Sequence, residues 1–545
     1  MDLIPPSRKA SLDSLAIEAA ASTQTREAQW GTAWPLHGAH GTRLIEAQRL
    51  LQWPPGRLMA WAGRRVARWA LSQAPHAQRV WVAAGPGGNG VDGLHAARHL
   101  AELGRQVVIT LHAAHREPRP DTDAVLRLAL DAGCKLAQQP PQGWADLVID
   151  ALLGLGANRP LDASIAAAVK EINDQPSPCL SIDLPTGLNA DTGQLLGGDW
   201  IRAHATLSLL TLKPGLFMGH GRDAAGKIWF DPLDSTPLER SVDPTAVTVG
   251  PAPWAQQALD RAHASHKGRF GDVIVLGGAP GMSGALRLAA HAALAAGAGR
   301  VIAVPLDAAA DLADPTRPEC MWMRPETLSD YPLEKATVVC GCGGAAWIRT
   351  WMLAILQRAG RLVLDADALN AAAQHPAQLH ALRERRSNGL VSIITPHPLE
   401  AARLLNCTVQ DIQSDRLGAA RRLSDHCLAT AVLKGSGTVI ATLGGLPEIN
   451  ITGNGALATG GTGDVLAGWL AGRWSTTSQL IPQVRPGFDA PSGCPLDEES
   501  LRAHRIACEA VRVHGQAADL YGAANALRAA DLVESMRSLV RRSFA

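Results

Sequence analysis

A glycine-rich segment that ends in a carboxylate, Asp464, has the clearest chemical use in this sequence. Residues 454–464 read Asn-Gly-Ala-Leu-Ala-Thr-Gly-Gly-Thr-Gly-Asp and run directly into the apolar residues 465–470. Glycine lets a backbone approach a phosphate closely, and a helix that begins near Gly463 would aim unpaired N–H groups and its positive dipole end at that anion. A carboxylate beside bound phosphate has a use when it takes a proton, so we interpret Asp464 as a general base in phosphoryl transfer. The alternative is that Asp464 caps a helix after a glycine turn.

A second glycine-rich turn, residues 85–93, reads Gly-Pro-Gly-Gly-Asn-Gly-Val-Asp-Gly and follows a strand expected to end at Ala84. Open α/β sheets bind ligands at the carboxyl ends of their strands. Asp150 and Asp183 end two further expected strands, so three polar strand ends can meet in one crevice. Asp183 is the candidate acid and base there. The structural alternative is a tight turn capped by Asp92, with Asp183 capping the turn that follows it.

The bulk composition favours an enzyme that acts on small molecules. A chain of 545 residues with 46% hydrophobic and 19% charged residues is long enough for two or more domains. A net charge of +1 gives no basic field for nucleic acid, and no apolar run is long enough to cross a membrane. The nine cysteines form no CxxC pair and no histidine cluster has ligand spacing, which argues against a disulfide framework and a structural zinc site. We therefore expect a cytoplasmic protein without nucleic-acid or membrane partners, and a homo-oligomer.

Two series of alternating strands and helices are expected to position these residues. Apolar residues at helical spacing between Leu44 and Leu71, interrupted at 53–56, predict two leading helices. The first series comprises strands at 79–84, 106–111, 146–150 and 179–183, with helices at 94–103, 121–132 and 164–173. The second comprises strands at 272–276, 300–304, 336–339, 362–364, 392–394 and 431–433, with Ala-rich helices between them. This alternation predicts an α/β protein with two domains, each a layered sheet with helices on both faces.

The expected boundaries follow the same pattern. Residues 1–40 show mixed periodicity and are expected to be an N-terminal extension, and the first domain covers 41–240. Repeated prolines mark 241–262 as a linker, and the second domain covers 263–545. Within it, the polar, Pro- and Gly-bearing residues 474–499 are expected to be a surface loop insertion.

The first half resembles the NAD(P)H-hydrate epimerases, which have a Rossmann-like three-layer sandwich. The resemblance rests on the glycine turn at 85–93, on Asp-Ala-Leu-Leu-Gly-Leu-Gly at 150–156 and on Ser-Ile-Asp-Leu-Pro-Thr-Gly at 181–187. It implies that Asp183 lies nearest the reacting centre, and that a potassium ion is bound by Asn89, Asp150 and Thr186. The resemblance further implies hydrate-binding residues at Gly88, Asn89, Gly90, Val91, Asp92, Gly154, Leu155, Gly156, Ala157, Asn158, Arg159 and Pro160.

The second half resembles the nucleotide-dependent NAD(P)H-hydrate dehydratases, relatives of the ribokinase-like kinases. The segments that carry it lie at successive expected strand ends: 266–278, 281–285, 339–344, 364–370, 395–400, 433–438 and 454–464. The resemblance implies that the hydrated cofactor is bound by Ala285, Gly343, His397 and Asp464. It implies that the nucleotide is bound by Lys434, Gly435, Ser436, Gly437, Thr438 and Gly463. Structurally, His397 could instead be a satisfied loop histidine between two prolines, and Lys434 a solvated charge at a strand end.

Together the two halves resemble bifunctional enzymes that repair hydrated NADH and NADPH. The implied first activity interconverts the R and S hydrate epimers. The implied second activity dehydrates the S epimer with ADP to give NAD(P)H, AMP and phosphate, with Mg²⁺ bridging the nucleotide phosphates. ATP could replace ADP as the phosphoryl donor.

Two rival hypotheses remain open on the sequence. The Gly-Thr-Gly-Asp464 segment also suits a kinase of a small alcohol such as a vitamin precursor. Gly88, Val91 and Leu155 depart from the epimerase pattern, so the first domain could instead be a binding module without catalysis.

Overall fold

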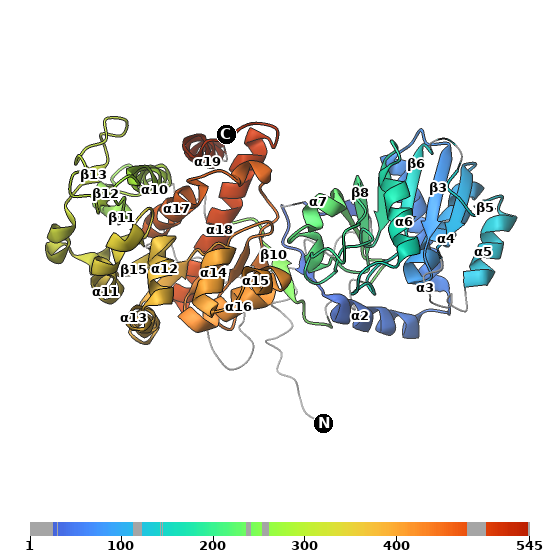
Figure 1. Cartoon of the computed structure of the whole chain (residues 1–545), viewed down its shortest axis with the longest axis horizontal. Coiled ribbons are helices and arrows are strands. Elements are labelled where there is room, and N and C mark those ends of the chain that lie inside the picture. The colour runs from blue at the N-terminus through green and yellow to red at the C-terminus, as the bar shows by residue number, and fades with distance from the viewer. Residues whose placement is uncertain are drawn as a thin grey trace, which may run out of the picture. The chain divides into compact units, whose positions relative to one another are not determined.

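The computed structural model describes residues 25–542 except 30, 113–121, 142, 144, 236–240, 253–260 and 477–496. The described residues form two compact units that divide between Val247 and Thr248, called here the N-terminal unit and the C-terminal unit (Figure 1). Both are α/β, as the alternation of strands and helices predicts. Among the described residues, no helix is both long enough and apolar enough to cross a membrane.

The N-terminal unit contains an eight-stranded sheet in the order β1-β9-β8-β7-β6-β3-β4-β5. All neighbouring strands are parallel except the antiparallel pair β1–β9. The strands in chain order are β1 Arg26–Glu27, β3 Arg79–Ala84, β4 Gln106–Leu111, β5 Lys135–Ala137, β6 Leu147–Ala151, β7 Cys179–Ile182, β8 Ala205–Leu209 and β9 Lys227–Asp231. The helices are α2 Ala39–Gln52, α3 Arg57–Gln73, α4 Gly88–Glu102, α5 Thr122–Asp131, α6 Ala163–Asn173 and α7 Gly221–Ala225, with a 3₁₀ turn, η2, at Pro214–Leu216.

Strand β3 shows why this sheet is covered on both faces. Its side chains alternate, so Val80 and Val82 join the core formed with α3, α4 and α5, while Trp81 and Ala83 join the core formed with α6. A central parallel strand has no solvent-facing side, which explains its continuous apolar sequence. The result is a three-layer sandwich that presents the carboxyl ends of β3, β6 and β7 along one edge.

The C-terminal unit has strands in the order β13-β12-β11-β14-β15-β16-β17-β18-β19. Strands from β11 to β17 pair in parallel, and β17–β18 and β18–β19 pair antiparallel. The strands are β11 Asp272–Gly277, β12 Arg300–Pro305, β13 Met321–Trp322, β14 Thr337–Cys340, β15 Arg361–Leu364, β16 Val391–Ile394, β17 Thr430–Leu433, β18 Val439–Ala441 and β19 Glu448–Ile449. The helices are α10 Ser283–Ala295, α11 Arg349–Arg358, α12 Asp367–Gln374, α13 Pro376–Ser387, α14 Pro398–Leu405, α15 Val409–Ser414, α16 Arg416–Cys427, α17 Thr462–Thr476, α18 Glu498–Tyr521 and α19 Ala529–Arg542. The 3₁₀ turns are η3 Lys267–Phe270, η4 Pro325–Asp330, η5 Leu333–Lys335, η6 Ala345–Ile348 and η7 Gly455–Leu457.

Several expected boundaries differ from the structure. Within the expected extension 1–40, β1 pairs with β9, and β2 (Pro35–Leu36) pairs with β10 (Ala246–Thr248). Strand β10 in turn lies inside the expected linker 241–262. These strands are only two or three residues long, so their pairing leaves no clear periodicity in the sequence. Residues 1–24 and 253–260 lie outside the described residues.

The expected loop insertion 474–499 also begins too early and ends too late. Residues 474–476 complete α17, because Trp474 is fully buried in the core shared by α10, α17, α18 and α19. Asp497 caps α18, which begins at Glu498. Residues 477–496 lie outside the described residues.

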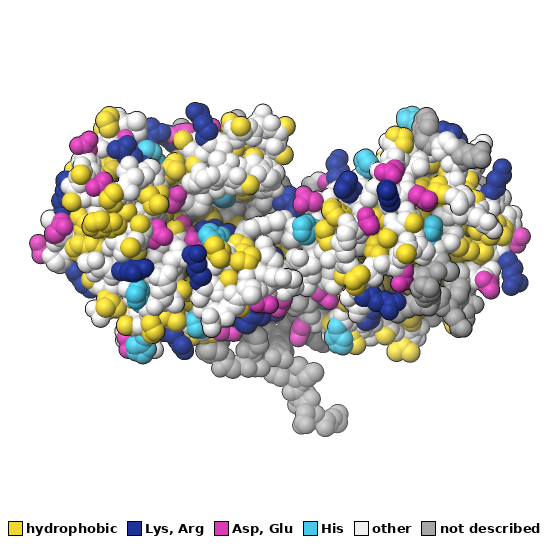
Figure 2. Space-filling view, in the orientation of Figure 1, with side chains coloured by type: hydrophobic (Ala, Val, Ile, Leu, Met, Phe, Trp, Pro, Cys, Tyr) yellow, Lys and Arg dark blue, Asp and Glu magenta, His cyan; other side chains and the backbone are white. Residues whose placement is uncertain are grey.

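Charged side chains of both signs are interspersed over the visible face of each unit (Figure 2). This distribution agrees with the net charge of +1.

Helix α17, which carries Asp464, packs against α10 through two glycines one turn apart. A Cβ at Gly468 would overlap the carbonyl oxygen of Ala289, and one at Gly472 would lie 2.5 Å from the carbonyl oxygen of Ala293. Small residues let two helix backbones come this close, so Gly468 and Gly472 set the position of α17 on the sheet.

We expect Gly468→Ala to destabilise the C-terminal unit by about 2 kcal/mol, because the overlap with a backbone atom outweighs the better helix propensity of alanine. Gly284→Ala, in the first turn of α10, is the matched control, since a Cβ there meets nothing within 4 Å. Urea denaturation followed by tryptophan fluorescence measures both. Equal stability of the two variants would contradict the close-packing argument.

Candidate active sites

The glycine turn at residues 85–93 of the N-terminal unit is tightly packed and leads into helix α4. A Cβ at Gly85 would overlap the carbonyl oxygen of Leu152, and one at Gly90 would overlap that of Gly85, whereas Gly87 faces open space. Helix α4 begins at Gly88, earlier than the expected start at Leu94. Gly88, Asn89, Gly90, Val91 and Asp92 therefore form the first turns of α4, where N–H groups are available to an anion.

Val91 does not obstruct this turn. Its side chain is 1% exposed and packs into the core with α3 and β3. The valine that replaces glycine at this position therefore fills the core. Val91 does not support the rival hypothesis that the first domain is a binding module without catalysis.

The three expected potassium ligands lie at neighbouring strand ends. Thr186 donates from Oγ1 to Asp150 Oδ1 (2.7 Å) and from its backbone N–H to Asp150 Oδ2 (2.9 Å). Ser181 also donates to Asp150 Oδ2 (2.8 Å). Burial raises the pKa of Asp150 against the effect of these hydrogen bonds, which lower it.

The side chain of Asn89 is buried, yet neither its amide oxygen nor its amide nitrogen bonds to any of the described residues. It lies against Gly154, where a Cβ would come within 3.2 Å of Asn89 Cγ. A buried amide without a partner is costly, so this group is expected to bind a ligand.

Asp183 follows β7 in a left-handed backbone conformation (φ 65°), which is uncommon for a residue other than glycine. The fully buried ammonium of Lys213 donates to Asp183 Oδ1, to Ser208 Oγ (3.2 Å) and to the Leu209 carbonyl (2.7 Å). These three acceptors satisfy its three N–H groups. The Leu209 N–H also donates to Asp183 Oδ1 (3.2 Å), and none of the described residues bonds Oδ2.

Sequence reasoning missed Lys213. It follows β8 in the run Thr-Leu-Lys-Pro-Gly, which carries no glycine-rich signal of its own, and only the parallel pairing of β7 with β8 brings it to Asp183.

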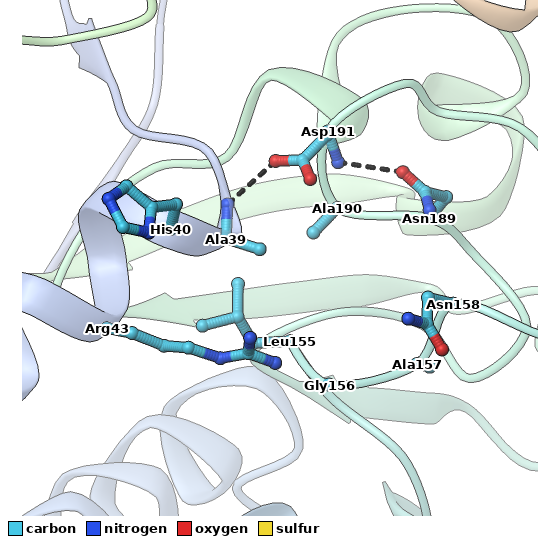
Figure 3. A pocket seen from close by; sticks show the side chains of 10 residues that line it. All are labelled: Ala39, His40, Arg43, Leu155, Gly156, Ala157, Asn158, Asn189, Ala190 and Asp191. Atoms are coloured by element: carbon cyan, nitrogen blue, oxygen red, sulfur yellow. Dashed lines mark hydrogen bonds between the residues drawn. The ribbon is translucent and has the colours of Figure 1, made fainter.

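A cavity of about 270 Å³ lies beside the expected hydrate-binding loop (Figure 3). Leu155, Gly156, Ala157 and Asn158 line one side, and Arg159 and Pro160 continue the loop as exposed residues. The rest of the lining comes from Ala39, His40, Arg43, Asn189, Ala190 and Asp191. Asp191 Oδ1 accepts from the Ala39 N–H (2.7 Å), which fixes the start of α2 against the segment that contains Asn189, Ala190 and Asp191. Arg43 adds a cation to this wall, in a helix that the sequence pattern did not connect with the site.

In the C-terminal unit, Asp464 lies in the first turn of α17 beside a buried charge cluster. Lys434 Nζ donates to Asp365 Oδ1 (2.7 Å), and Thr395 Oγ1 donates to the same oxygen (2.7 Å). A Cβ at Gly463 would lie 3.3 Å from Lys434 Nζ, so the ammonium reaches the glycine turn itself. Carboxyl or thiol atoms of Cys342, Asp365 and Asp464 lie within 4.8 Å of one another.

This environment raises the pKa of Asp464 to about 6, because burial and the negative charge of Asp365 disfavour its ionised form more than the Cys342 thiol and Lys434 favour it. Burial lowers the pKa of Lys434, but the Asp365 and Glu400 carboxylates outweigh it and hold that pKa above its usual value. The cluster thus keeps a permanent cation next to a carboxyl group that titrates close to neutrality.

The remaining expected contacts fall around this cluster. Gly343 (φ 60°) packs against Ala285, since a Cβ at Gly343 would lie 3.0 Å from that of Ala285. The loop 434–438 follows β17, and Arg416 donates to the carbonyl oxygens of Leu433, Lys434 and Gly437 (3.1, 3.1 and 3.3 Å). Arg416, missed by sequence reasoning, therefore shapes the loop that carries Gly435, Ser436 and Thr438.

His397 has a structural role in addition to any contact with substrate. Its Nδ1 accepts from the N–H groups of Leu399 (3.1 Å) and Glu400 (3.3 Å), and Glu400 Oε2 accepts from the His397 N–H (2.8 Å). This capping box starts α14 and matches the structural alternative. Burial raises the pKa of Glu400 to about 7, and that carboxyl is a second titratable group that the sequence did not reveal.

Comparisons with known proteins assign a family to each half of the chain. Residues 55–215 match the family model described as YjeF-related protein N-terminus, and residues 273–538 match the model described as NAD(P)H-hydrate dehydratase.

Curated relatives match most of the chain. The bifunctional NAD(P)H-hydrate repair enzyme Nnr of Escherichia coli is 34% identical over 497 residues, covering 89% of each chain. The bifunctional NAD(P)H-hydrate repair enzyme of Leishmania braziliensis is 34% identical over 519 residues, covering 86% of each. A solved structure of the ADP/ATP-dependent NAD(P)H-hydrate dehydratase from Bacillus subtilis, co-crystallised with ATP and Mg²⁺, is 27% identical with a TM-score of 0.40, and the match covers 53% of this chain and 96% of that one. The chain belongs to the family of bifunctional NAD(P)H-hydrate repair enzymes.

Proposed function

We propose that the C-terminal unit dehydrates the S epimer of hydrated NADH and NADPH with ADP, and that the N-terminal unit interconverts the R and S epimers. The observation that carries the first part is Asp464, a half-exposed carboxyl group at a helix N-terminus with Lys434 beside it and a pKa of about 6. The observation that carries the second part is Asp183, held at one oxygen by Lys213.

In the dehydration, Asp464 takes the proton of the hydrate's hydroxyl group. The resulting oxygen attacks the terminal phosphate of ADP and releases AMP. The phosphate ester then eliminates phosphate as the ring nitrogen donates its electron pair, and the resulting iminium ion loses a proton from the neighbouring ring carbon to solvent, which restores NAD(P)H. Lys434 and the N–H groups at the start of α17 lie where charge develops on the transferred group.

Mg²⁺ would neutralise charge on the nucleotide phosphates. The Cys342–Asp365–Asp464 cluster does not suit it as a protein cage, because Asp365 already accepts from Lys434 and Thr395, and a thiol is a poor ligand for a hard cation. Mg²⁺ commonly binds through substrate phosphates with few protein ligands, which agrees with this arrangement.

In the epimerisation, Asp183 acts first as an acid that helps water leave the hydrated ring carbon, and then as a base when water returns on the other face. Its Oδ2 is available to the substrate, while Lys213 and the Leu209 N–H fix Oδ1. The oxygen groups around Asp150, together with the unpartnered amide of Asn89, fit the oxygen ligands of a potassium ion. A potassium ion there would supply positive charge that orients the hydrate and its oxygen ligands.

Asp464→Asn should lower the dehydration rate by about 10²–10⁴-fold, because the base is lost. In the wild type the rate should fall as pH drops through about 6, since a raised pKa means that Asp464 is protonated, and inactive, below that value. The return of reduced-nicotinamide absorbance from S hydrate with ADP or ATP measures both effects. A rate that stays constant down to about pH 4, near the ordinary value of 3.8, would reject Asp464 as the base. A phosphorylated product without dehydration would favour the kinase hypothesis.

Asp183→Asn and Lys213→Met should each lower epimerisation by about 10²–10⁴-fold without changing the dehydration of S hydrate. With a mixture of epimers, recovery of NAD(P)H should stop at the fraction supplied as the S epimer. Lys227→Met, an exposed lysine on β9, is the control and should allow complete recovery. The same early stop in the wild type would identify the N-terminal unit as a binding module.

Replacement of K⁺ by Na⁺ should slow epimerisation in the wild type, because the smaller ion suits a different set of distances. Asn89→Ala should raise the K⁺ concentration needed for half-maximal rate by at least about tenfold. Asn158→Ala, in the cavity wall, serves as the matched asparagine control and should keep the normal K⁺ response. An unchanged response in Asn89→Ala would remove Asn89 from the ion site.

A further inference from the structure

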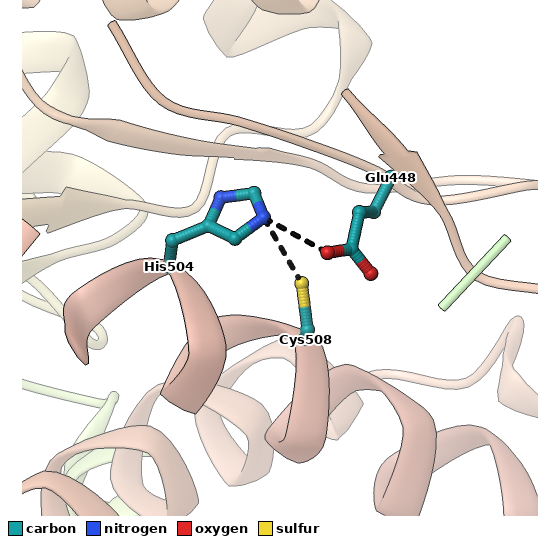
Figure 4. Close-up of side chains that lie close together, drawn as sticks. All are labelled: Glu448, His504 and Cys508. Atoms are coloured by element: carbon teal, nitrogen blue, oxygen red, sulfur yellow. Dashed lines mark hydrogen bonds and ion pairs between the residues drawn. The ribbon is translucent and has the colours of Figure 1, made fainter. Parts of the chain in front are cut away.

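Three side chains with metal-binding atoms converge in the C-terminal unit, in a cluster that the proposed reactions do not use (Figure 4). His504 and Cys508 lie one turn apart on α18, and Glu448 projects from β19 toward the same point. All three are buried, with exposures of 4%, 7% and 8% for His504, Cys508 and Glu448. We call them the 448/504/508 cluster.

The distances in this cluster match those between ligands of one tetrahedral ion. His504 Nε2 lies 3.2 Å from Glu448 Oε1 and 3.5 Å from Cys508 Sγ. Zinc bonds of about 2.3 Å to sulfur and about 2.0–2.2 Å to nitrogen and oxygen put tetrahedral ligand atoms about 3.4 Å (N to O) and about 3.6 Å (N to S) apart. The observed separations agree with both values.

The Cys508 thiol also pairs with the Glu448 carboxylate, so hydrogen bonds can link the three groups when no ion is bound. A ring nitrogen has a single in-plane direction, either one N–H or one lone pair, yet His504 Nε2 has an oxygen and a sulfur as neighbours. One ion between the three atoms would satisfy the lone pair of Nε2, the carboxylate and a thiolate together. It would also compensate the buried negative charges, which are costly without a cation.

The other ring nitrogen is already held in the manner of a metal-binding histidine. His504 Nδ1 lies 2.8 Å from Thr442 Oγ1, which lies 3.0 Å from Thr430 Oγ1 on β17. Such a hydrogen bond at the second nitrogen fixes the tautomer and the ring orientation of a ligating histidine. When Nδ1 carries the proton and Thr442 accepts it, the lone pair of Nε2 points into the cluster.

We propose that Glu448, His504 and Cys508 bind one zinc ion, with a water molecule or the second carboxylate oxygen as fourth ligand. The thiol loses its proton to solvent when the ion binds. The mixed oxygen, nitrogen and sulfur set suits zinc and its spectroscopic substitute cobalt, whereas Mg²⁺ and Ca²⁺ prefer oxygen ligands alone. The ion would join α18 to the β18–β19 hairpin.

The test uses the full chain, stripped of metal with a chelator and titrated with Co²⁺ and then with Zn²⁺. We expect a thiolate-to-cobalt charge-transfer band that saturates at about one ion per chain and disappears when zinc displaces cobalt. Cys508→Ser should abolish the band. Cys427→Ser, which alters another buried free cysteine of the same unit, should retain it.

A second variant keeps the proposal testable if Cys508→Ser does not fold. Thr442→Val retains all three ligands and should weaken zinc binding by about 10–100-fold, because it releases Nδ1. Dehydration activity in the presence of Mg²⁺ serves as the check that each variant is folded. No charge-transfer band in the wild type, or an equal band in folded Cys508→Ser, would overturn the proposal and leave a hydrogen-bonded trio.

Discussion

In the C-terminal unit, the buried carboxyl group of Asp365 and the partly buried one of Asp464 lie close to the single ammonium group of Lys434. Asp365 forms the ion pair with Lys434, and burial together with the negative charge of Asp365 raises the pKa of Asp464. One pair can stay ionised in this small volume, while the second carboxylate is held close to its titration point. The members of this cluster come from the ends of β14, β15 and β17 and from the start of α17. The cluster therefore depends on the positions of all four elements.

The N-terminal unit uses the opposite arrangement. Asp183 has its own buried cation, Lys213, and the three N–H groups of that ammonium are all used. An aspartate held this way at one oxygen has a fixed direction for the other, which suits proton transfer to and from the water that leaves and rejoins the ring carbon. The two halves therefore place an aspartate at the edge of a parallel sheet and differ in the charge they put beside it.

The sequence predicted the parts of these sites that depend on glycine turns and on strand ends. The α/β class, the two units and the family were confirmed, since apolar strand segments and helices alternate clearly along the chain. Asp464 and Asp183 could be proposed as site residues because each ends a recognisable motif. Lys213, Arg416 and Glu400 could not, because their roles come from contacts between strands and helices far apart in sequence. Loop 474–499 was bounded too widely because Trp474 is one apolar residue in a polar stretch, and only the packing of α17 shows that it is buried.

The same reasoning explains why the cysteines suggested no metal site in the sequence. Ligand spacing rules detect paired cysteines and histidines within short loops. His504 and Cys508 lie one helical turn apart on α18. The third member of the cluster, Glu448, is separated from them in the sequence by α17 and residues 477–496. Helix α18 brings them together, and the same helix carries His514, whose Nε2 lies 3.0 Å from the Thr462 carbonyl at the start of α17. Burial lowers the pKa of His514 to about 4, so this ring is neutral and donates its one proton to that carbonyl. An ion that fixed α18 against the β18–β19 hairpin would therefore also stabilise the position of α17, whose first turn contains Asp464.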